Sequence, residues 1–173
     1  MGTTVGTNAL LEKKGVPHAL LITQGFGDVL AIGNQTRRTL FSLTPEKVPC
    51  LYSRVVELPE RVAVSGTVLQ PLAAEKVQQQ LGELKAEGYE SLAVVLLHSW
   101  NNPEHELLVG KLAREMGFRN VSLSHEVSPR IGVVARGETT LVDAYLTPLL
   151  AQYIARFRQT LQHCEIQMMQ SNG

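Results

Sequence analysis

Apolar residues along this chain alternate between short continuous runs and helical stripes. Residues 18–23 (HALLIT) and 91–97 (SLAVVLL) are apolar runs bounded by turn residues, and they are too short to span a membrane. They therefore predict buried strands, and residues 120–123 predict a third. Apolar stripes at residues 72–87 and 103–117 predict two helices. The resulting strand–helix–strand order favours a parallel crossover and an α/β fold.

The two stripes define which helix faces should meet the core. In the first helix, Val77, Leu81 and Leu84 recur at helical spacing, and Gly88 is a natural stop. Pro103 suits the first turn of the second helix. The predicted core face of the second helix comprises Leu107, Leu108, Leu112 and Met116.

The remaining segments predict one antiparallel portion and two further helices. Residues 4–14 predict a short helix, which ends before Gly15. Residues 52–69 alternate around turn residues, which predicts antiparallel strands joined by tight turns. Residues 138–162 predict a long helix that Pro148 would kink or split. Its apolar stripe comprises Leu141, Tyr145, Leu149, Tyr153 and Phe157.

Composition and charge narrow the class of protein. Apolar residues make up 44% of the 173 residues and charged residues 18%, which is typical of a globular chain. The net charge is zero, so we expect neither nucleic acid nor a membrane as a partner. Cys50 and Cys164 have no metal-binding spacing, and two free thiols in a reducing compartment are the simplest interpretation.

Five strings stand out in order along the chain. They are GTTVGTNALLE (2–12), GFGDVLAIGNQTR (25–37), HSWNNPEHE (98–106), RGETTLVDAYLTP (136–148) and MQSNG (169–173). Together they resemble the N-terminal region of the hydantoinase A/5-oxoprolinase family, which writes the first two as GTTVATNALLER-like and GFRDVLxIGRQxRP-like strings. No single string carries this resemblance, but the set covers essentially the whole chain.

The resemblance implies an α/β fold that is part of an actin/Hsp70-like ATPase lobe with a small inserted α+β subdomain. Residues 1–47 and 119–173 would form the lobe portion, and residues 48–118 the insertion. The family's DVGGTFTD-like phosphate loop should precede this sequence, and a GGL-like continuation should follow it. We therefore expect a chain truncated at both ends and inactive alone.

The implied activity is ATP-dependent opening of a cyclic amide, with 5-oxoproline, ATP and water giving glutamate, ADP and phosphate. ATP and Mg²⁺ are the implied cofactors. The implied partners are a small cyclic amide and the remainder of the enzyme or a second subunit, with a homo-oligomer in the full protein and a cytoplasmic location. Two alternatives stay open. One is a non-catalytic module that binds nucleotide or another subunit, and the other is a subunit of an ATP-dependent ketone carboxylase or hydantoinase.

The first string supplies the main candidate binding residues. Small residues allow backbone N–H groups to approach an anion, and hydroxyl and amide side chains add hydrogen bonds. We expect these side chains to line a nucleotide–substrate cleft, although Thr7 or Asn8 could equally be a helix cap. The candidates are Gly2, Thr3, Thr4, Thr7 and Asn8.

Two arginines are candidate anion ligands, because a guanidinium binds carboxylate or phosphate through paired N–H groups. Arg37 is one, with a solvated loop position as the alternative. Arg136 is the preferred anion clamp, because it should precede a helix N-terminus that bears Thr139 and Thr140. Those two threonines are candidate ligands or helix caps.

His98 is a candidate site residue because it follows a predicted strand, where open α/β sheets bind ligands. A purely structural role for His98 is the alternative. His98 and His105 lie seven residues apart, which is not a recognised metal spacing, so we predict no metal site. The sequence identifies no general base.

Overall fold

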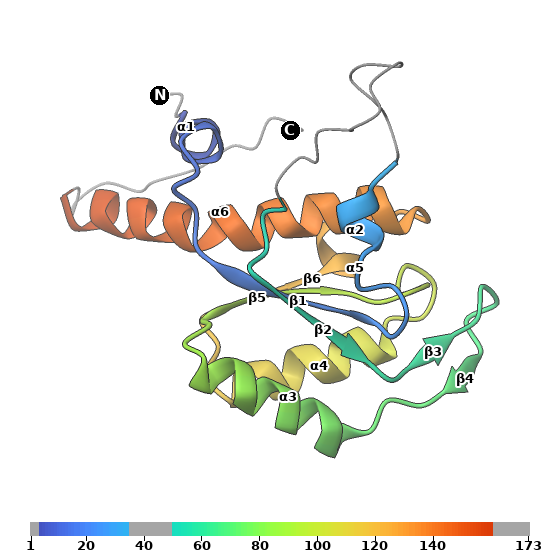
Figure 1. Ribbon diagram of the computed structural model, residues 1–173. Helices are drawn as coiled ribbons and strands as arrows, with labels where there is room; N and C mark the ends of the chain where they lie inside the picture. The colour runs from blue at the N-terminus through green and yellow to red at the C-terminus, as the bar shows by residue number, and fades with distance from the viewer. Residues whose placement is uncertain (1–3, 35–49, 161–173) are drawn as a thin grey trace.

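The computed structural model describes residues 4–34 and 50–160. Its helices and strands largely alternate (Figure 1). The helices are α1 (Val5–Leu11), α2 (Val29–Ile32), α3 (Ala74–Ala86), α4 (Glu104–Glu115), α5 (Ser124–Val127) and α6 (Val133–Thr160). The strands are β1 (His18–Thr23), β2 (Arg54–Leu58), β3 (Arg61–Val62), β4 (Val68–Gln70), β5 (Ser91–Val95) and β6 (Asn120–Leu123).

A four-stranded parallel sheet, in the order β2-β1-β5-β6, organises the fold. Leu21 of β1 pairs with Val56 of β2 on one side and with Val94 of β5 on the other. Every residue of β1 and β5 is buried. Such burial is typical of a parallel sheet covered on both faces, and it explains why these strands are continuous apolar runs. The α/β prediction is confirmed.

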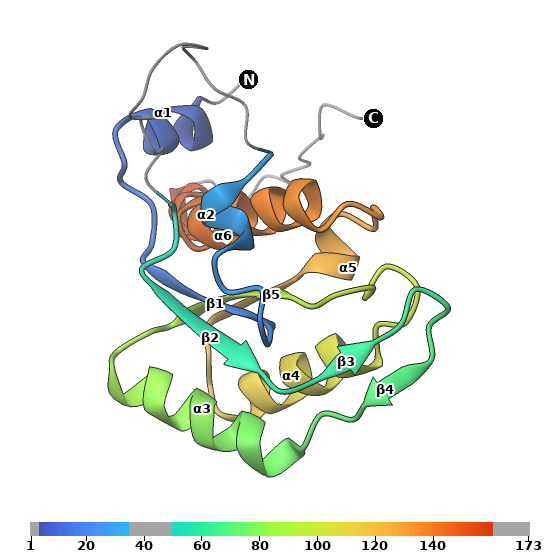
Figure 2. The same ribbon diagram turned by 45° about the vertical axis from the view of Figure 1, so that its right-hand side comes forward.

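Helices cover both faces of this sheet. Figures 1 and 2 show α3 and α4 on one face and α2 and α6 on the other, with α1 packed on α6. Alternate residues of β1 serve the two layers, because successive side chains of a strand point to opposite faces. Leu21 joins the core under α3 and α4, whereas Leu20 joins the core under α6.

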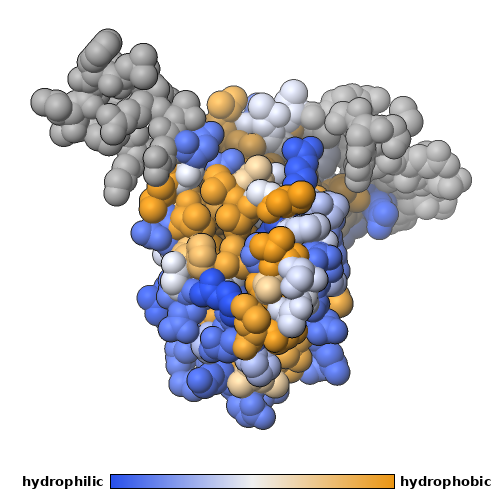
Figure 3. All heavy atoms as spheres, turned by 90° about the vertical axis from the view of Figure 1, so that its right-hand side faces the viewer, coloured by the Kyte–Doolittle hydropathy of each residue, from blue (hydrophilic) through white to orange (hydrophobic). Residues whose placement is uncertain are grey.

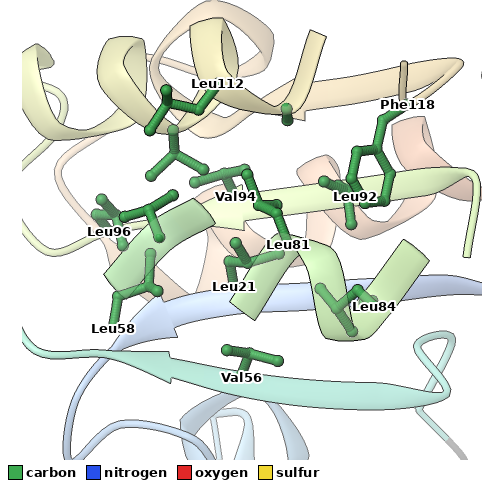
Figure 4. Packing of buried hydrophobic residues seen from close by; sticks show 14 of the residues in the cluster. Leu21, Val56, Leu58, Leu81, Leu84, Leu92, Val94, Leu96, Leu112 and Phe118 are labelled. Atoms are coloured by element: carbon green, nitrogen blue, oxygen red, sulfur yellow. The ribbon is translucent and has the colours of Figure 1, made fainter. Parts of the chain in front are cut away.

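The larger core lies between the sheet and helices α3 and α4 (Figure 4). The predicted stripe of α3 is confirmed, since Val77, Leu81 and Leu84 are all buried there. The predicted face of α4 is wrong at Leu107, which is 46% exposed. Its buried face includes instead two polar side chains, His105 and Glu106.

Residues 52–69 are only partly antiparallel. β2 joins the main sheet in parallel with β1, whereas β3 and β4 form a small antiparallel pair. β2 and β5 lie within residues 48–118, yet they share one sheet with β1 and β6. The division into a lobe and an inserted subdomain stays a prediction.

The long helix α6 begins at Val133, five residues before the predicted start. Gly137, just before the predicted start, lies inside the helix, where a Cβ would come within 2.6 Å of Leu30 of α2. A small residue is therefore needed for close packing. Pro148 lies inside α6 and does not split it. In the described part of the chain, no helix has both the length and the apolar character to cross a membrane.

Candidate functional site at the carboxyl edge of the sheet

The loops that follow β1, β5 and β6 meet at one edge of the parallel sheet, here called the carboxyl edge. In open α/β sheets this is the edge at which ligands bind. Figure 3 views the molecule from the side on which β3 and β4 lie, and hydrophobic surface occupies its middle between hydrophilic flanks. Exposed apolar side chains here include Val64 next to β3, Leu69 of β4 and Ile131 before α6.

Glu106 is the centre of a buried polar network at this edge. It projects from α4 with no exposed surface, accepts three hydrogen bonds and contacts one ring nitrogen. Its Oε1 accepts from the Leu96 amide at 2.9 Å and from the Ser124 hydroxyl at 2.6 Å. Its Oε2 accepts from the His125 amide at 3.0 Å and contacts Nδ1 of the His125 ring at 2.6 Å. One carboxylate thus ties α4 to the ends of β5 and β6.

Arg136 completes this network from α6 and is itself fully buried. Its Nε donates to the Ser124 hydroxyl at 2.8 Å, and its Nη2 donates to the Leu96 carbonyl at 2.6 Å. Its Nη1 donates to the carbonyl of Arg130 at 2.8 Å. Burial lowers the pKa of Arg136, and the charge of Glu106 acts in the opposite direction.

A second buried pair lies beside the first. Glu60 accepts a short hydrogen bond from the Thr23 hydroxyl, and its other oxygen lies 2.7 Å from Nδ1 of His105. The Thr23 hydroxyl also accepts from the Leu97 amide at 2.9 Å. The ends of β1 and β5 and the segment between β2 and β3 are therefore joined by polar side chains.

Arg136 has a role different from the predicted anion clamp. Its N–H groups donate to protein oxygens inside the molecule, so the guanidinium holds loops together. Thr139 and Thr140 lie in the second turn of α6 and donate to the carbonyls of Ala135 and Arg136, four residues earlier. They are not N-terminal caps, and Thr140 is fully buried.

His98 lies at the carboxyl edge, as predicted, and is partly exposed. Its φ of 59° is unusual for a residue other than glycine. Its carbonyl accepts from the amides of Asn101 at 2.9 Å and Asn102 at 3.1 Å, so it forms a tight turn. The neighbouring Ser99 lies 3.1 Å from Ser124, which joins the loops after β5 and β6.

The predicted residues of the first string lie elsewhere. Thr4 flanks the N-terminus of α1, and Thr4, Thr7 and Asn8 are all exposed. The amide of Asn8 donates to the Thr4 hydroxyl at 3.4 Å. Neither Thr7 nor Asn8 is therefore the cap residue of this helix. Predictions for Gly2, Thr3 and Arg37 fall outside the described residues.

The structure therefore does not bring the predicted site residues into one group. α1 packs against the later part of α6, where a Cβ on Gly6 would lie 3.6 Å from Leu146. Arg136 and Leu146 are ten residues apart on α6, a separation of about 15 Å along a helix axis. The exposed side chains of α1 and the carboxyl edge are thus two separate regions.

Two pockets lie away from the carboxyl edge. One of about 420 Å³ is lined by residues that include Pro17, Ser53 and Tyr89. The other, of about 280 Å³, lies between α2 and α6 and is lined in part by Tyr52. Burial raises the pKa of Tyr52. Among residues 4–34 and 50–160, no group of three or more His, Cys, Asp or Glu side chains could hold a metal ion.

Sequence reasoning missed Glu60, Ser124 and His125. Their side-chain hydrogen-bond partners lie 12 to 45 residues away in the sequence, so no local spacing connects them. The string SHEV at residues 124–127 was the available signal, because it places a hydroxyl, an imidazole and a carboxylate directly after a predicted strand.

Comparison with known proteins supplies the family. The profile of the hydantoinase/oxoprolinase N-terminal region matches residues 1–117. 5-Oxoprolinase 1 of Arabidopsis thaliana is 45% identical in an alignment that covers all of this chain and 16% of that protein. The chain therefore spans about one sixth of the length of this curated relative.

Two solved structures share the fold. An ATP-dependent caprolactamase from Pseudomonas jessenii superposes with a TM-score of 0.81 at 29% identity, covering 93% of this chain and 24% of that one. A nucleotide-free acetone carboxylase superposes with a TM-score of 0.78 at 21% identity, covering 91% of this chain and 24% of that one. From the profile match, the chain belongs to the hydantoinase/oxoprolinase N-terminal region family.

Proposed function

We propose that this chain is a region of an ATP-dependent enzyme that opens a cyclic amide, with 5-oxoproline as the substrate. The observation that carries this proposal is the 45% identity to 5-oxoprolinase 1 across the whole chain. The fold shared with a caprolactamase, whose substrate is named as a lactam, supports the same reaction class. The products would be glutamate, ADP and phosphate.

Coupling to ATP suits the chemistry of a five-membered lactam. Its carbonyl is a poor electrophile, and phosphorylation of the carbonyl oxygen makes the carbon more electrophilic and provides a better leaving group. Water can then attack, the ring C–N bond breaks to leave an acyl phosphate, and a second water releases phosphate from it. Backbone and basic donors stabilise phosphate charge in such reactions.

This chain supplies only part of such a site. Exposed Thr4, Thr7 and Asn8 can donate hydrogen bonds to an anion across a cleft, which suits the edge of a nucleotide site. ATP and Mg²⁺ are the proposed cofactors. The remainder of the enzyme or a second subunit is thus the proposed partner, in a cytoplasmic homo-oligomer.

The proposal is tested with a chimera of Arabidopsis thaliana 5-oxoprolinase 1 in which this chain replaces the matching region. We expect ADP release that depends on 5-oxoproline. Hydantoin, and acetone with bicarbonate, are the comparison substrates. ADP release that depends on either of these instead of 5-oxoproline would identify a hydantoinase or a ketone carboxylase.

The controls are the chain alone and 5-oxoprolinase 1 without the matching region. Neither should hydrolyse ATP in response to 5-oxoproline. A folded, soluble chimera that cleaves ATP with none of the three substrates would contradict the enzyme proposal. Binding of ATP without cleavage in that chimera would support the non-catalytic module instead.

A further inference from the structure

The hydrogen bonds around Glu106 assign its protonation state. Its two oxygens accept hydrogen bonds from the amides of Leu96 and His125 and from the hydroxyl of Ser124. Arg136 is buried in the same network and requires a negative charge nearby. Glu106 is therefore ionised and can only accept hydrogen bonds.

An ionised Glu106 fixes the tautomer of His125. The Nδ1 atom of His125 lies 2.6 Å from Oε2, so Nδ1 must carry the proton and donate it to that oxygen. In the neutral ring, Nε2 is then the proton-accepting atom. A carboxylate that holds Nδ1–H in this way orients an imidazole and stabilises the positive charge formed when Nε2 takes up a proton.

The environment leaves Nε2 of His125 available. The side chain is 15% exposed, and Nε2 makes no hydrogen bond with the described residues. Among the described residues, the buried side-chain polar atoms without a hydrogen-bond partner are Nε2 of His18 and Nε1 of Trp100. Nε2 of His125 is not one of these buried atoms. The ring nitrogen that can accept a proton is thus the one open to solvent, at the carboxyl edge.

The charged groups around this ring come from three helices. Glu106 of α4 and Arg136 of α6 belong to the buried network. Arg114 of α4 lies 3.9 Å from Glu126, the residue after His125 on α5, and both are about half exposed. The charged group in direct contact with the ring is therefore the carboxylate of Glu106.

We propose that His125 is the proton acceptor for the water that attacks the activated cyclic amide, and that Glu106 is its positioning residue. This inference rests on the proposed function. The water oxygen forms a bond to the carbonyl carbon while one water proton passes to Nε2 of His125. The π electrons of the C=N bond of the phosphorylated lactam move to the ring nitrogen, which receives both water protons, one of them from the imidazolium, as the C–N bond breaks. The product is an acyl phosphate, from which a second water releases phosphate.

The first test is the ring tautomer in this chain. Nitrogen–proton correlation NMR of the imidazoles separates protonated from unprotonated ring nitrogens. At a pH where the ring is neutral, we expect a protonated Nδ1 and an unprotonated Nε2 for His125. Glu106→Gln should abolish this preference, and Glu106→Asp should partly restore it. A neutral ring protonated at Nε2 in the wild-type chain would overturn the inference.

The second test is kinetic and uses the chimera. His125→Asn keeps a donor near the position of Nδ1 and removes Nε2. General base catalysis contributes about 100-fold to 10,000-fold, so kcat should fall by at least about 100-fold with KM nearly unchanged. The pH dependence of kcat should lose the limb that reports the base.

His105→Asn is the matched control, because His105 also contacts a buried glutamate through Nδ1. It should retain most of the activity if the pair with Glu60 is structural. If the His125→Asn chimera is as active as an active unsubstituted chimera, the proton-acceptor role of His125 is wrong and the proposed function stands. An unsubstituted chimera without activity would overturn the proposed function, and the proton-acceptor role with it.

Discussion

At the scale of single residues, the carboxyl edge depends on Arg136. Its guanidinium joins α6 to Leu96 after β5, to Ser124 on α5 and to Arg130 in the loop before α6. A buried charge of this kind is tolerated only when it is paired and hydrogen-bonded, and Glu106 meets that need. Arg136, which was predicted to bind the anion of a ligand, thus balances the charge of the buried Glu106 carboxylate.

Arg136→Met should strongly destabilise the chain, because it leaves Glu106 buried without its opposite charge. We expect the free energy of unfolding to fall by about 3–5 kcal/mol, measured by urea denaturation. Arg119→Met is the control, since Arg119 forms an exposed ion pair with Glu90 and should contribute at most about 1 kcal/mol. Equal losses in the two variants would contradict the buried-network interpretation.

His18 should give the fold a dependence on pH. It is fully buried on β1, its Nδ1 lies 3.2 Å from the Val16 carbonyl, and its Nε2 has no partner in the described residues. Burial lowers the pKa of His18 from its ordinary value of 6.5, and the contact with Val16 acts weakly against this. Below pH 6.5 the unfolded chain therefore binds a proton that the folded chain resists, so stability falls as the pH falls.

The measurement compares urea unfolding of the wild-type chain and His18→Leu between pH 5 and pH 8, a range of about 1.5 units on either side of the ordinary histidine pKa. The difference in unfolding free energy should be constant above the unfolded pKa. Below it, the wild-type chain should lose stability faster than the variant. Parallel curves across the whole range would show that His18 does not titrate differently in the two states.

At the scale of elements, α6 determines where the other parts of its layer lie. The amide of Val16, just before β1, donates to the Tyr145 carbonyl at 3.0 Å. A Cβ on Gly15 would come within 2.1 Å of the Tyr145 ring. The connection between α1 and β1 therefore lies flat against α6, and only glycine fits there.

Gly15→Ala should destabilise the chain by about 1–3 kcal/mol, because the buried Tyr145 ring has to move. Gly132→Ala is the matched control, since a Cβ there meets no atom within 4 Å and its φ is not in the left-handed region. Thermal unfolding of the two variants tests this directly. If both melt at the wild-type temperature, the close contact is not a constraint.

The range of β1 agrees with its prediction, because a short, fully buried apolar run between turn residues has few alternatives. The range of β6 also agrees, although only its second half is buried. The antiparallel prediction for β2 is wrong. β2 is an edge strand with one partly exposed face, and buried and exposed side chains alternate along such a strand in parallel and antiparallel sheets alike. α6 begins earlier than predicted, and the close packing of Gly137 against Leu30 is a contact that spacing alone does not show.

At the scale of the whole molecule, most of the candidate site could not be predicted. Glu60 meets His105 across 45 residues, and Leu96 meets Arg136 across 40. Such contacts arise only when parallel strands bring their carboxyl ends together. His98 was placed correctly because the position of a strand end is readable from sequence, whereas the partners across that edge are not.

The two separate regions also explain how a chain of this kind could serve a larger enzyme. α1, which carries exposed polar side chains, and the carboxyl edge lie at different positions along α6. Each can contact a different part of the remaining polypeptide, which in 5-oxoprolinase 1 is most of the protein.

The most direct test of this account is the ratio of products formed by the chimera with 5-oxoprolinase 1. If this chain serves an enzyme that couples ATP cleavage to opening of a cyclic amide, ADP and glutamate should appear in equal amounts from 5-oxoproline, and neither should form without it. ADP formed at the same rate with and without 5-oxoproline, and with no glutamate, would contradict the account.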